Sequence, residues 1–414
     1  MGEINRLGLS RELRLVVLGI FLNYVGYGAV LPFEIIYLHD GRGFSLGVAG
    51  LVVGSSTGVA VVTAPFAGQL IDRFGARAVA TGAGVALAAG YIGLAFARSP
   101  ALAFVAATIA GAGNGALNPS QSTLVATLVP PELRHRATAV SRVAANVGAG
   151  IGGGVGGLVA AYGLAGFVTL FLANGASYLV YVAVLVAVVR DAARPEPITG
   201  GYRHVLRDRA FVHLAVTNVA MIAVGWGVFT WLVPPFAGTA LGISPQLTGL
   251  LLLANAATVA VAQVPIARLA EGRRRAVMMA LAGWMFVGAC LLVLAAGAGM
   301  AYAALLTAVI VVGIGECFHT TVLMPLVADL APASLRGRYM ASMGLSWWVG
   351  LAIAPAFGTQ LLGVSPAATF LVAAAVAGMA GMSAVALERR LPDGCRLTPS
   401  PHGASPLPVA GRSA

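Results

Sequence analysis

The chain has 414 residues, of which 59% are hydrophobic and 9% are charged, and its formal net charge is +11. A soluble protein carries about 25% charged residues, so this composition excludes a soluble globular domain and indicates a membrane protein. All 25 basic residues are Arg, which excludes a nucleotide-binding P-loop and a Schiff-base enzyme, because both chemistries need Lys. The three cysteines, Cys290, Cys317 and Cys395, lack the paired spacing of a disulfide framework or a zinc site.

Several apolar runs are long enough to cross a bilayer, for which a helix needs about 20 mostly apolar residues. We identify twelve, at residues 14–38, 47–70, 78–97, 101–126, 137–161, 167–190, 211–237, 247–267, 276–297, 301–327, 338–362 and 366–387. The first run has no small-residue cleavage site, so we expect a retained helix and not a signal peptide. The sequence therefore predicts an all-α membrane protein with twelve transmembrane helices.

The distribution of arginine among the loops orients these helices. With both termini placed inside, only Arg42 and Arg98 fall in outside loops. Arg collects in cytoplasmic loops, so this alternation supports twelve spans and places both termini in the cytoplasm. It also explains the positive charge without a nucleic-acid partner. The Lys-free composition, rich in Ala, Gly and Arg, is typical of a high-GC bacterium, so we expect a multi-pass protein of the bacterial cell membrane.

A polar loop from Arg190 to Arg209, after the sixth span, divides the chain into two similar halves. At an offset of 202 residues, Leu128, Pro130, Leu133, Arg134, Arg136 and Ala139 correspond to Leu330, Pro332, Leu335, Arg336, Arg338 and Ala341. We therefore predict a six-helix bundle at 1–190, a cytoplasmic linker at 191–210, a second and pseudo-symmetric six-helix bundle at 211–388, and a disordered cytoplasmic tail at 389–414. Such a duplication is typical of transporters whose substrate site lies between the repeats.

The loop after the second span contains a charged and glycine-rich motif. It reads Gly68-Gln-Leu-Ile-Asp72-Arg73-Phe-Gly75-Ala-Arg77 and resembles the loop signature of the major facilitator superfamily, specifically of its twelve-helix drug–proton antiporter branch. The resemblance implies that the carboxylate caps a helix of the other half and that the arginines lock the cytoplasmic side during the cycle. The alternative is a simple positive-inside turn. By the same resemblance we assign a gating role to Asp329, Arg336 and Arg338 in the second half.

The fifth span is similar to the antiporter signature of that branch. Its glycines are Gly148, Gly150, Gly152, Gly153, Gly154, Gly156 and Gly157. Gly153 stands where the family has Pro, so the alternative is that these glycines serve close helix packing alone. Two further departures concern charge: the family's Arg near the start of the fourth span is missing, and Thr127 stands where many relatives have an acidic residue.

Three ionisable residues lie inside predicted spans, where such groups are costly and usually functional. They are Glu34 in the first span and Glu316 with His319 in the tenth. At 1.5 Å per residue, Glu316 lies roughly 20 Å deep, near the midplane. His319 follows three residues later, on the same helical face. We predict that Glu316 is the main proton carrier, that His319 adjusts it, and that Glu34 is the second candidate; the alternative is a fixed hydrogen bond between helices.

Neutral polar and aromatic residues suggest a substrate cavity between the halves. Asn23 and Tyr27 share a face of the first helix with Glu34, and the fourth helix carries Asn114, Asn118 and Gln121 on one face. Tyr24, Tyr27, Trp226 and Trp231 could form an aromatic wall for lipophilic or cationic substrates, although Trp and Tyr also collect at membrane interfaces.

From these residues we predict a monomeric, proton-coupled efflux antiporter for small lipophilic compounds such as drugs, antibiotics or metabolites, working by alternating access without a cofactor or a metal. One alternative is a proton-coupled symporter for a small nutrient, although a charged nutrient would need a basic residue in the cavity and none is found outside the loops. The other is a membrane receptor or enzyme. Against an enzyme, the chain contains neither His-Glu-x-x-His nor Gly-x-Ser-x-Gly.

Overall fold

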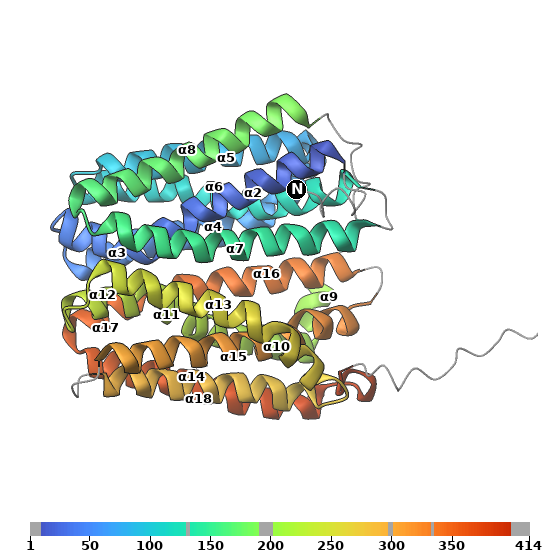
Figure 1. Cartoon of the computed structure of the whole chain (residues 1–414). Helices are drawn as coiled ribbons and strands as arrows, with labels where there is room; N and C mark the ends of the chain where they lie inside the picture. The colour runs from blue at the N-terminus through green and yellow to red at the C-terminus, as the bar shows by residue number, and fades with distance from the viewer. Residues whose placement is uncertain (1–9, 130–132, 190–201, 297–300, 333–334, 399–414) are drawn as a thin grey trace, which may run out of the picture.

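A computed structural model of the chain describes residues 10–129, 133–189, 202–296, 301–332 and 335–398. Within these residues all regular elements are helical, and twelve helices are long and apolar enough to cross a membrane, which confirms the predicted fold class and number of spans. The helices of the first half form one group and those of the second half another, stacked against each other in Figure 1. Consecutive spans run in opposite directions.

The first half contains six spans. The first consists of α2 (Arg11–Val30), a 3-10 turn η1 (Leu31–Phe33), α3 (Glu34–Ile36) and a π-helical segment η2 (Tyr37–Gly41). It is followed by α4 (Leu46–Phe74), α5 (Ala76–Phe96), α6 (Pro100–Thr127), α7 (Arg134–Ala160) and α8 (Leu164–Val188).

The second half begins with the short helix α9 (Tyr202–Arg207), which lies inside the predicted linker. The seventh span contains α10 (Arg209–Ile222), η4 (Ala223–Val228), α11 (Phe229–Trp231) and α12 (Val233–Thr239). The eighth, ninth and tenth spans are α13 (Pro245–Ala270), α14 (Arg275–Ala295) and α15 (Ala301–Leu330). The eleventh span consists of α16 (Arg336–Ile353), η6 (Ala354–Gly358) and α17 (Thr359–Val364). The twelfth is α18 (Pro366–Leu387). The earlier part of the linker, residues 190–201, lies outside the described residues.

Serine and proline determine where several spans begin. The hydroxyl groups of Ser99, Ser244 and Ser365 each accept a hydrogen bond from the backbone N–H three residues later. A proline follows each of these serines and occupies the first helical position, where its missing N–H costs no hydrogen bond. These Ser-Pro pairs therefore start the fourth, eighth and twelfth spans.

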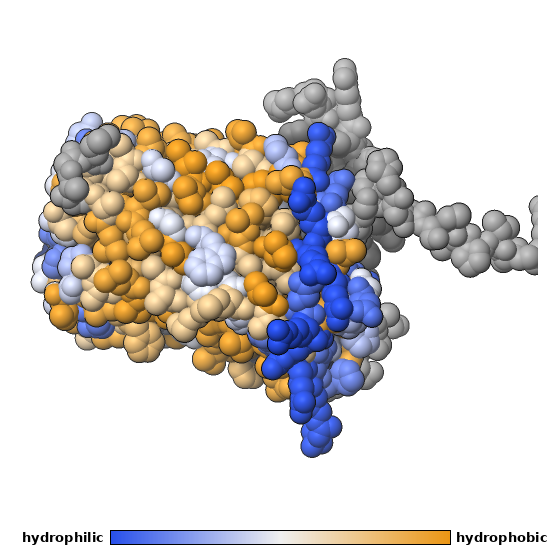
Figure 2. Space-filling view, turned by 90° about the horizontal axis from the view of Figure 1, so that it is seen from below, coloured by the Kyte–Doolittle hydropathy of each residue, from blue (hydrophilic) through white to orange (hydrophobic). Residues whose placement is uncertain are grey.

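The surface matches a membrane environment. Large apolar side chains such as Val62, Leu102 and Val261 are exposed along the helices, and Figure 2 shows this apolar surface ending at a hydrophilic band at one end of the molecule. We call this the arginine-rich end; its exposed arginines include Arg11, Arg73, Arg207, Arg268 and Arg273. The other is called the opposite end.

Glycine allows several helices to pack backbone against backbone. A Cβ atom at Gly148 would lie 2.7 Å from the carbonyl oxygen of Phe21, and one at Gly156 would lie 2.5 Å from that of Ala29. Gly152, between them, is equally close to the backbone of α2. Since a carbonyl oxygen cannot rotate away as a side chain can, α7 and α2 can adopt this spacing only with glycine at these positions.

The two groups of helices also touch each other at the opposite end. There α4 meets α17, where Gln360 Nε2 donates to the carbonyl of Gly47 at 2.8 Å. Gly54 meets Ala356, whereas Gly58, one turn further along α4, would have no atom within 4 Å of a Cβ. On the other side of the molecule, a Cβ at Gly157 of α7 would lie 2.6 Å from the carbonyl of Pro245 in α13. The structure is therefore closed at the opposite end.

Residues 388–398 correct the predicted boundary of the disordered tail. They form two short 3-10 turns, η7 (Glu388–Arg390) and η8 (Asp393–Cys395), and an isolated antiparallel bridge between Leu397 and Arg274. Leu391 and Cys395 are buried and anchor this segment. Residues 399–414, with the prolines that suggested disorder, lie outside the described residues.

Candidate functional site

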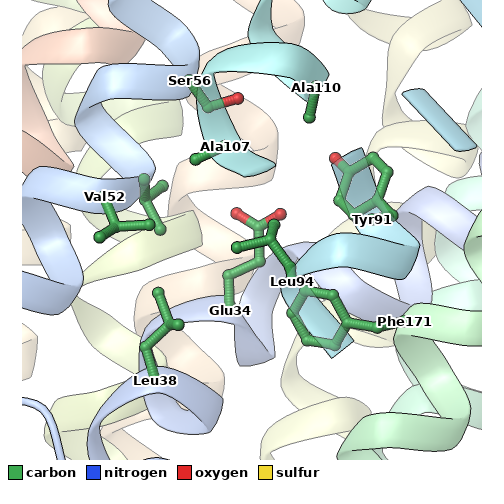
Figure 3. Close-up of a pocket in the computed structure, with 10 residues that line it drawn as sticks. Glu34, Leu38, Val52, Ser56, Tyr91, Leu94, Ala107, Ala110 and Phe171 are labelled. Atoms are coloured by element: carbon green, nitrogen blue, oxygen red, sulfur yellow. The ribbon is translucent and has the colours of Figure 1, made fainter. Parts of the chain in front are cut away.

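Glu34 lies where the first span is interrupted. Pro32 occupies the 3-10 turn η1 just before it, because proline lacks an N–H and cannot continue a regular helix. The Glu34 side chain is 8% exposed and lines a pocket inside the first bundle with Leu38, Val52, Val53, Ser56, Tyr91, Leu94, Ala107, Ala110 and Phe171. Figure 3 shows its carboxyl group pointing into this pocket. A carboxyl group is thus held in a mainly apolar site.

One hydrogen-bond partner of Glu34, the Tyr91 hydroxyl, belongs to the first bundle, and the other comes from the second bundle. Trp231 Nε1 donates to Glu34 Oε2 at 3.4 Å, between residues 197 apart in the chain. Trp231 is 2% exposed, so it lies at the crossing of the first and seventh spans. We predicted Trp231 as part of a cavity wall; the structure instead buries it against Glu34.

Glu316 and His319 both lie on α15, but their surroundings differ. Glu316 is half-buried, and Asn255 Nδ2 of α13 donates to its Oε1 at 3.5 Å. His319 is fully buried and its ring centroid lies 5.4 Å from that of Trp226. Within the described residues, the ring nitrogens of His319 have no hydrogen-bond partner, so the expected interaction between His319 and Glu316 is not formed in this structure.

An aromatic cluster surrounds His319. Trp226 lies on η4, with its ring centroid 4.8 Å from that of Trp347 and 6.2 Å from that of Phe286. Trp226 and Trp347 are half-buried and can therefore contact a guest molecule. Sequence reasoning missed Trp347, although its position in the eleventh span, next to Trp348, was visible.

The polar residues predicted for the cavity separate into two groups. Tyr24 Oη donates to Asn118 Oδ1 at 3.4 Å; Asn118 is exposed, and Tyr27 and Asn114 are half-buried. Asn23 and Gln121 are 2% and 6% exposed and face the interior of the first bundle. Their place on the cavity wall therefore stays a prediction, because a shared helical face in the sequence does not say whether a neighbouring helix covers it.

The charged motif after the second span adopts the turn that its glycine requires. Gly75 has φ +86°, which favours glycine, and Gly68 has open space around it. Arg77 Nε and Nη2 donate to the carbonyls of Leu185 and Val186 at the end of α8. This is the favourable end of a helix for a cation.

Asp72 and Arg73 in the same motif are exposed. Among the described residues Asp72 forms no hydrogen bond or ion pair, so the capping of a helix of the other bundle that the resemblance implies stays a prediction.

The second half carries an ion pair at the corresponding end. Arg275 Nη2 lies 2.6 Å from Asp329 Oδ2, and the Arg275 side chain is 1% exposed. Arg338 is buried and Arg336 exposed. The role of Arg275 was missed because it follows two other arginines in a loop, where a solvated side chain is the usual expectation.

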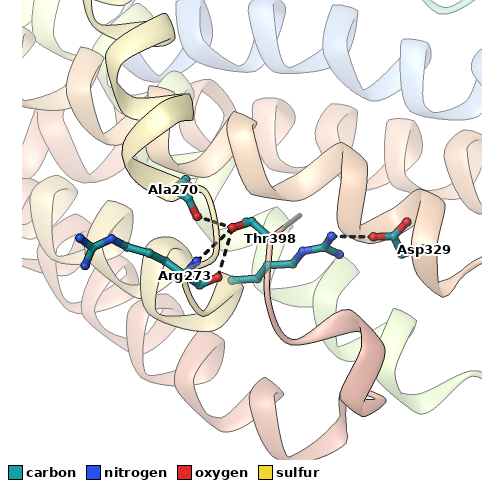
Figure 4. Close-up of polar contacts among 5 residues, drawn as sticks. Ala270, Arg273, Asp329 and Thr398 are labelled. Carbon is teal, nitrogen blue, oxygen red and sulfur yellow. Dashed lines mark hydrogen bonds and ion pairs between the residues drawn. The ribbon is translucent and has the colours of Figure 1, made fainter. Parts of the chain in front are cut away.

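The segment 391–398 lies beside this ion pair, and Figure 4 shows Thr398 bonded to Ala270 and Arg273. Arg275 N donates to the carbonyl of Arg396 at 2.9 Å, and Thr398 N donates to the carbonyl of Arg273 at 3.0 Å. The Thr398 hydroxyl also donates to the carbonyl of Ala270. We call residues 391–398 the strap, since they tie the loop between α13 and α14 to the end of the chain.

No group of three or more His, Cys, Asp or Glu side chains within the described residues could hold a metal ion. The three cysteines are free and buried. Two carboxyl groups inside the spans, Glu34 and Glu316, therefore remain the candidate reactive groups.

Comparison with known proteins finds similarity to membrane transporters at the level of both sequence and structure. The family model of the Major Facilitator Superfamily matches residues 16–234 and 216–413. The uncharacterized MFS-type transporter YttB of Bacillus subtilis is 27% identical over 366 residues, which cover 86% of this chain and 89% of the relative. Multidrug resistance protein MdtH of Aeromonas hydrophila is 27% identical over 371 residues, covering 84% and 85%. The structure of a bacterial homologue of the human lysosomal transporter Spinster has a TM-score of 0.76 at 13% identity, covering 94% of this chain and 98% of that chain.

Proposed function

Since the chain belongs to the Major Facilitator Superfamily of transporters, we propose that it is a proton-coupled antiporter that exports small lipophilic compounds. The substrate class is supported by the similarity to multidrug resistance protein MdtH. The arginine-rich end is taken as cytoplasmic, in agreement with the positive-inside rule. The closed opposite end then faces the outside, and the transporter acts as a monomer in the cell membrane.

The observation that carries the proposal is the pair of carboxyl groups inside the spans. The hydrogen-bond donors to Glu34 and Glu316 are indole, phenol and amide groups, and within the described residues neither carboxyl group forms an ion pair. Such groups are expensive in a membrane and are retained for function. A carboxyl group without a fixed cation can take up and release a proton, which is the chemistry that coupling requires.

Glu316 is the main proton carrier in this proposal. It is accessible enough to exchange a proton, and its partner Asn255 belongs to the same bundle, so its hydrogen bond survives when the two bundles move as rigid bodies. His319 lies about one turn along α15 from Glu316, and Trp226 of η4 packs against its ring. An apolar and aromatic wall beside a carboxyl group suits lipophilic compounds, including organic cations.

The test uses proteoliposomes with an imposed pH gradient and an internal pH indicator, screened with a panel of lipophilic compounds. We expect proton movement that depends on substrate and opposes its direction. Glu316→Gln retains the shape of the side chain but cannot release a proton, so it should eliminate substrate-driven proton movement while substrate binding persists. Glu271→Gln, at an exposed carboxyl in the loop between α13 and α14, is the matched control and should behave as the unmodified protein does.

Two outcomes would contradict the proposal. Movement of substrate and proton in the same direction would identify a symporter. Full substrate-driven proton movement in Glu316→Gln would show that another group carries the proton, with Glu34 the next to test.

A further inference from the structure

The hydrogen bond between Trp231 and Glu34 connects the two bundles. Its donor lies on α11 in the second bundle and its acceptor on α3 in the first, 3.4 Å apart. Both side chains are more than nine-tenths buried. The bond can exist only while the first and seventh spans meet at this crossing, so it belongs to the state that is closed at the opposite end.

Both helices are irregular at this crossing. The first span passes from α2 through the 3-10 turn with Pro32, and the seventh passes through the π-helical segment η4 before Pro234 in α12. The two prolines are 202 residues apart, the same offset that relates the two halves. Interrupted helices of this kind bend more easily than regular ones. The hydrogen bond therefore lies where both spans can move.

The surroundings of Glu34 leave the indole as its partner across the interface. The other titratable groups near it are phenols: Tyr27 on α2, Tyr178 on α8, and Tyr91 on α5, whose hydroxyl also donates to the Glu34 carboxyl group from within the first bundle. From α4 and α6 the pocket receives only Val52, Val53, Ser56, Ala107 and Ala110. No cation within the described residues lines this pocket, so the charge on Glu34 is not neutralised by a fixed partner.

We propose that Glu34 and Trp231 form a proton-sensitive latch that holds the opposite end closed while Glu34 is ionised. A hydrogen bond to a carboxylate is roughly twice as strong as one between neutral groups, so protonation of Glu34 weakens the bond from Trp231. Trp231 is in this view a positioning residue, which transmits the protonation state of Glu34 to the second bundle.

This inference rests on the proposed antiport and explains how it avoids a leak. A transporter that has released its proton and holds no substrate must not return to the outward-open state, because it would then carry protons inward without export. The ionised latch holds that empty form closed. Substrate binding supplies the free energy that breaks the latch, and the latch forms again when the end has closed and Glu34 has lost its proton.

The test measures opening of the opposite end directly, without transport. Tyr162 and Val364 are 80% and 84% exposed at that end, on different bundles. Spin labels at cysteines in these two positions, in a chain without its native cysteines, report the distance between the bundles in lipid nanodiscs as the pH is changed. We expect the longer distance to gain population as the pH falls.

Trp231→Phe removes the donor and with it the whole bond, so it should raise the open population at high pH by at least about tenfold and flatten the pH response. Glu34→Gln keeps only a neutral bond, so it should raise the open population by about tenfold and remove the pH response, and the double variant should match Trp231→Phe. Trp284→Phe, at a tryptophan that is 52% exposed on the surface, is the control and should change nothing.

The latch is refuted if Trp231→Phe keeps the pH response of the unmodified protein, or if the two single effects simply add. Should Trp231→Phe fail to insert, a retained pH response in Glu34→Gln alone refutes it. The latch and the proposed function fail separately. If antiport is observed but the pH dependence of the spin-label distance is unchanged in the variants, only the latch is refuted. If the latch depends on pH but no proton-coupled flux is observed, only the antiport is refuted.

Discussion

Replacing Gly157 by Ala should open the opposite end of the molecule. The added Cβ would lie 2.6 Å from the carbonyl oxygen of Pro245 and 2.9 Å from the Cα atom of Gly249. Both atoms belong to the backbone of α13, in the other bundle, so no side-chain rotation relieves the clash. Ordinary van der Waals contact begins at 3.4 Å. The two helices would therefore have to separate by about 0.8 Å to accept the added Cβ atom.

The free-energy cost of this clash falls on the closed state alone, because α7 and α13 separate when the opposite end opens. Overpacking of this size costs about 1–3 kcal/mol, which corresponds to a shift of about 5–150-fold in the balance between two conformations. Gly157→Ala should therefore raise the open population by at least about fivefold, and it should slow transport, since the cycle must pass through the closed state.

The spin-label distance between positions 162 and 364 measures this shift, and Gly154→Ala is its matched control. Gly154 lies on the same helix, but its Cβ would meet only the Leu253 side chain of α13, at 3.5 Å, so the distance should stay unchanged. Gly152→Ala should lower thermal stability without opening the end, because it clashes with α2 inside its own bundle. An unchanged distance in Gly157→Ala, with the protein folded and inserted, would refute the reasoning.

Two further predictions concern the arginine-rich end. Asp72→Asn should slow transport while substrate affinity, measured by equilibrium binding, stays within a few-fold, because this exposed carboxylate can act only when the bundles rock; a collapse in affinity at an unchanged rate would contradict the gating role. Truncation after Arg390 removes the strap and exposes Arg275, so the stability measured by thermal unfolding in detergent should fall by about 1–3 kcal/mol, the sum of several hydrogen bonds less the entropy of ordering the segment. Truncation after Thr398 is its control, and an equal loss there would contradict the role of the strap.

The twelve spans could be predicted because lipid imposes a simple requirement on sequence, a run of about 20 apolar residues. The predicted first and last residues of the spans were less accurate. The first span was predicted at 14–38 and extends over Arg11–Gly41, because the helix continues through polar residues such as His39 and Asp40 after the apolar run stops. Hydropathy marks the part of a helix that lies in lipid, and the Ser10 cap and the positive φ of Gly43 mark where the chain turns.

The pairing of side chains could not be predicted in this way. Glu34 was identified as a buried ionisable group, but its partner Trp231 lies 197 residues away, and neither periodicity nor the repeat offset relates the two. The strap was missed for a different reason. Its composition resembles a polar tail, and only Leu391 and Cys395, each buried in the structure, distinguish it from the proline-rich residues that follow.

The two carboxyl groups differ in a way that bears on mechanism. Glu316 is bonded to Asn255 within its own bundle, so rocking of the two bundles leaves that bond intact and changes only which side of the membrane can reach the group. Glu34 is bonded across the interface, so rocking makes or breaks its bond. In the proposed antiport, a proton on Glu316 is therefore carried by the movement, whereas a proton on Glu34 sets whether the movement is allowed. An exchanger needs both properties, because carriage without control would leak protons and control without carriage would couple nothing.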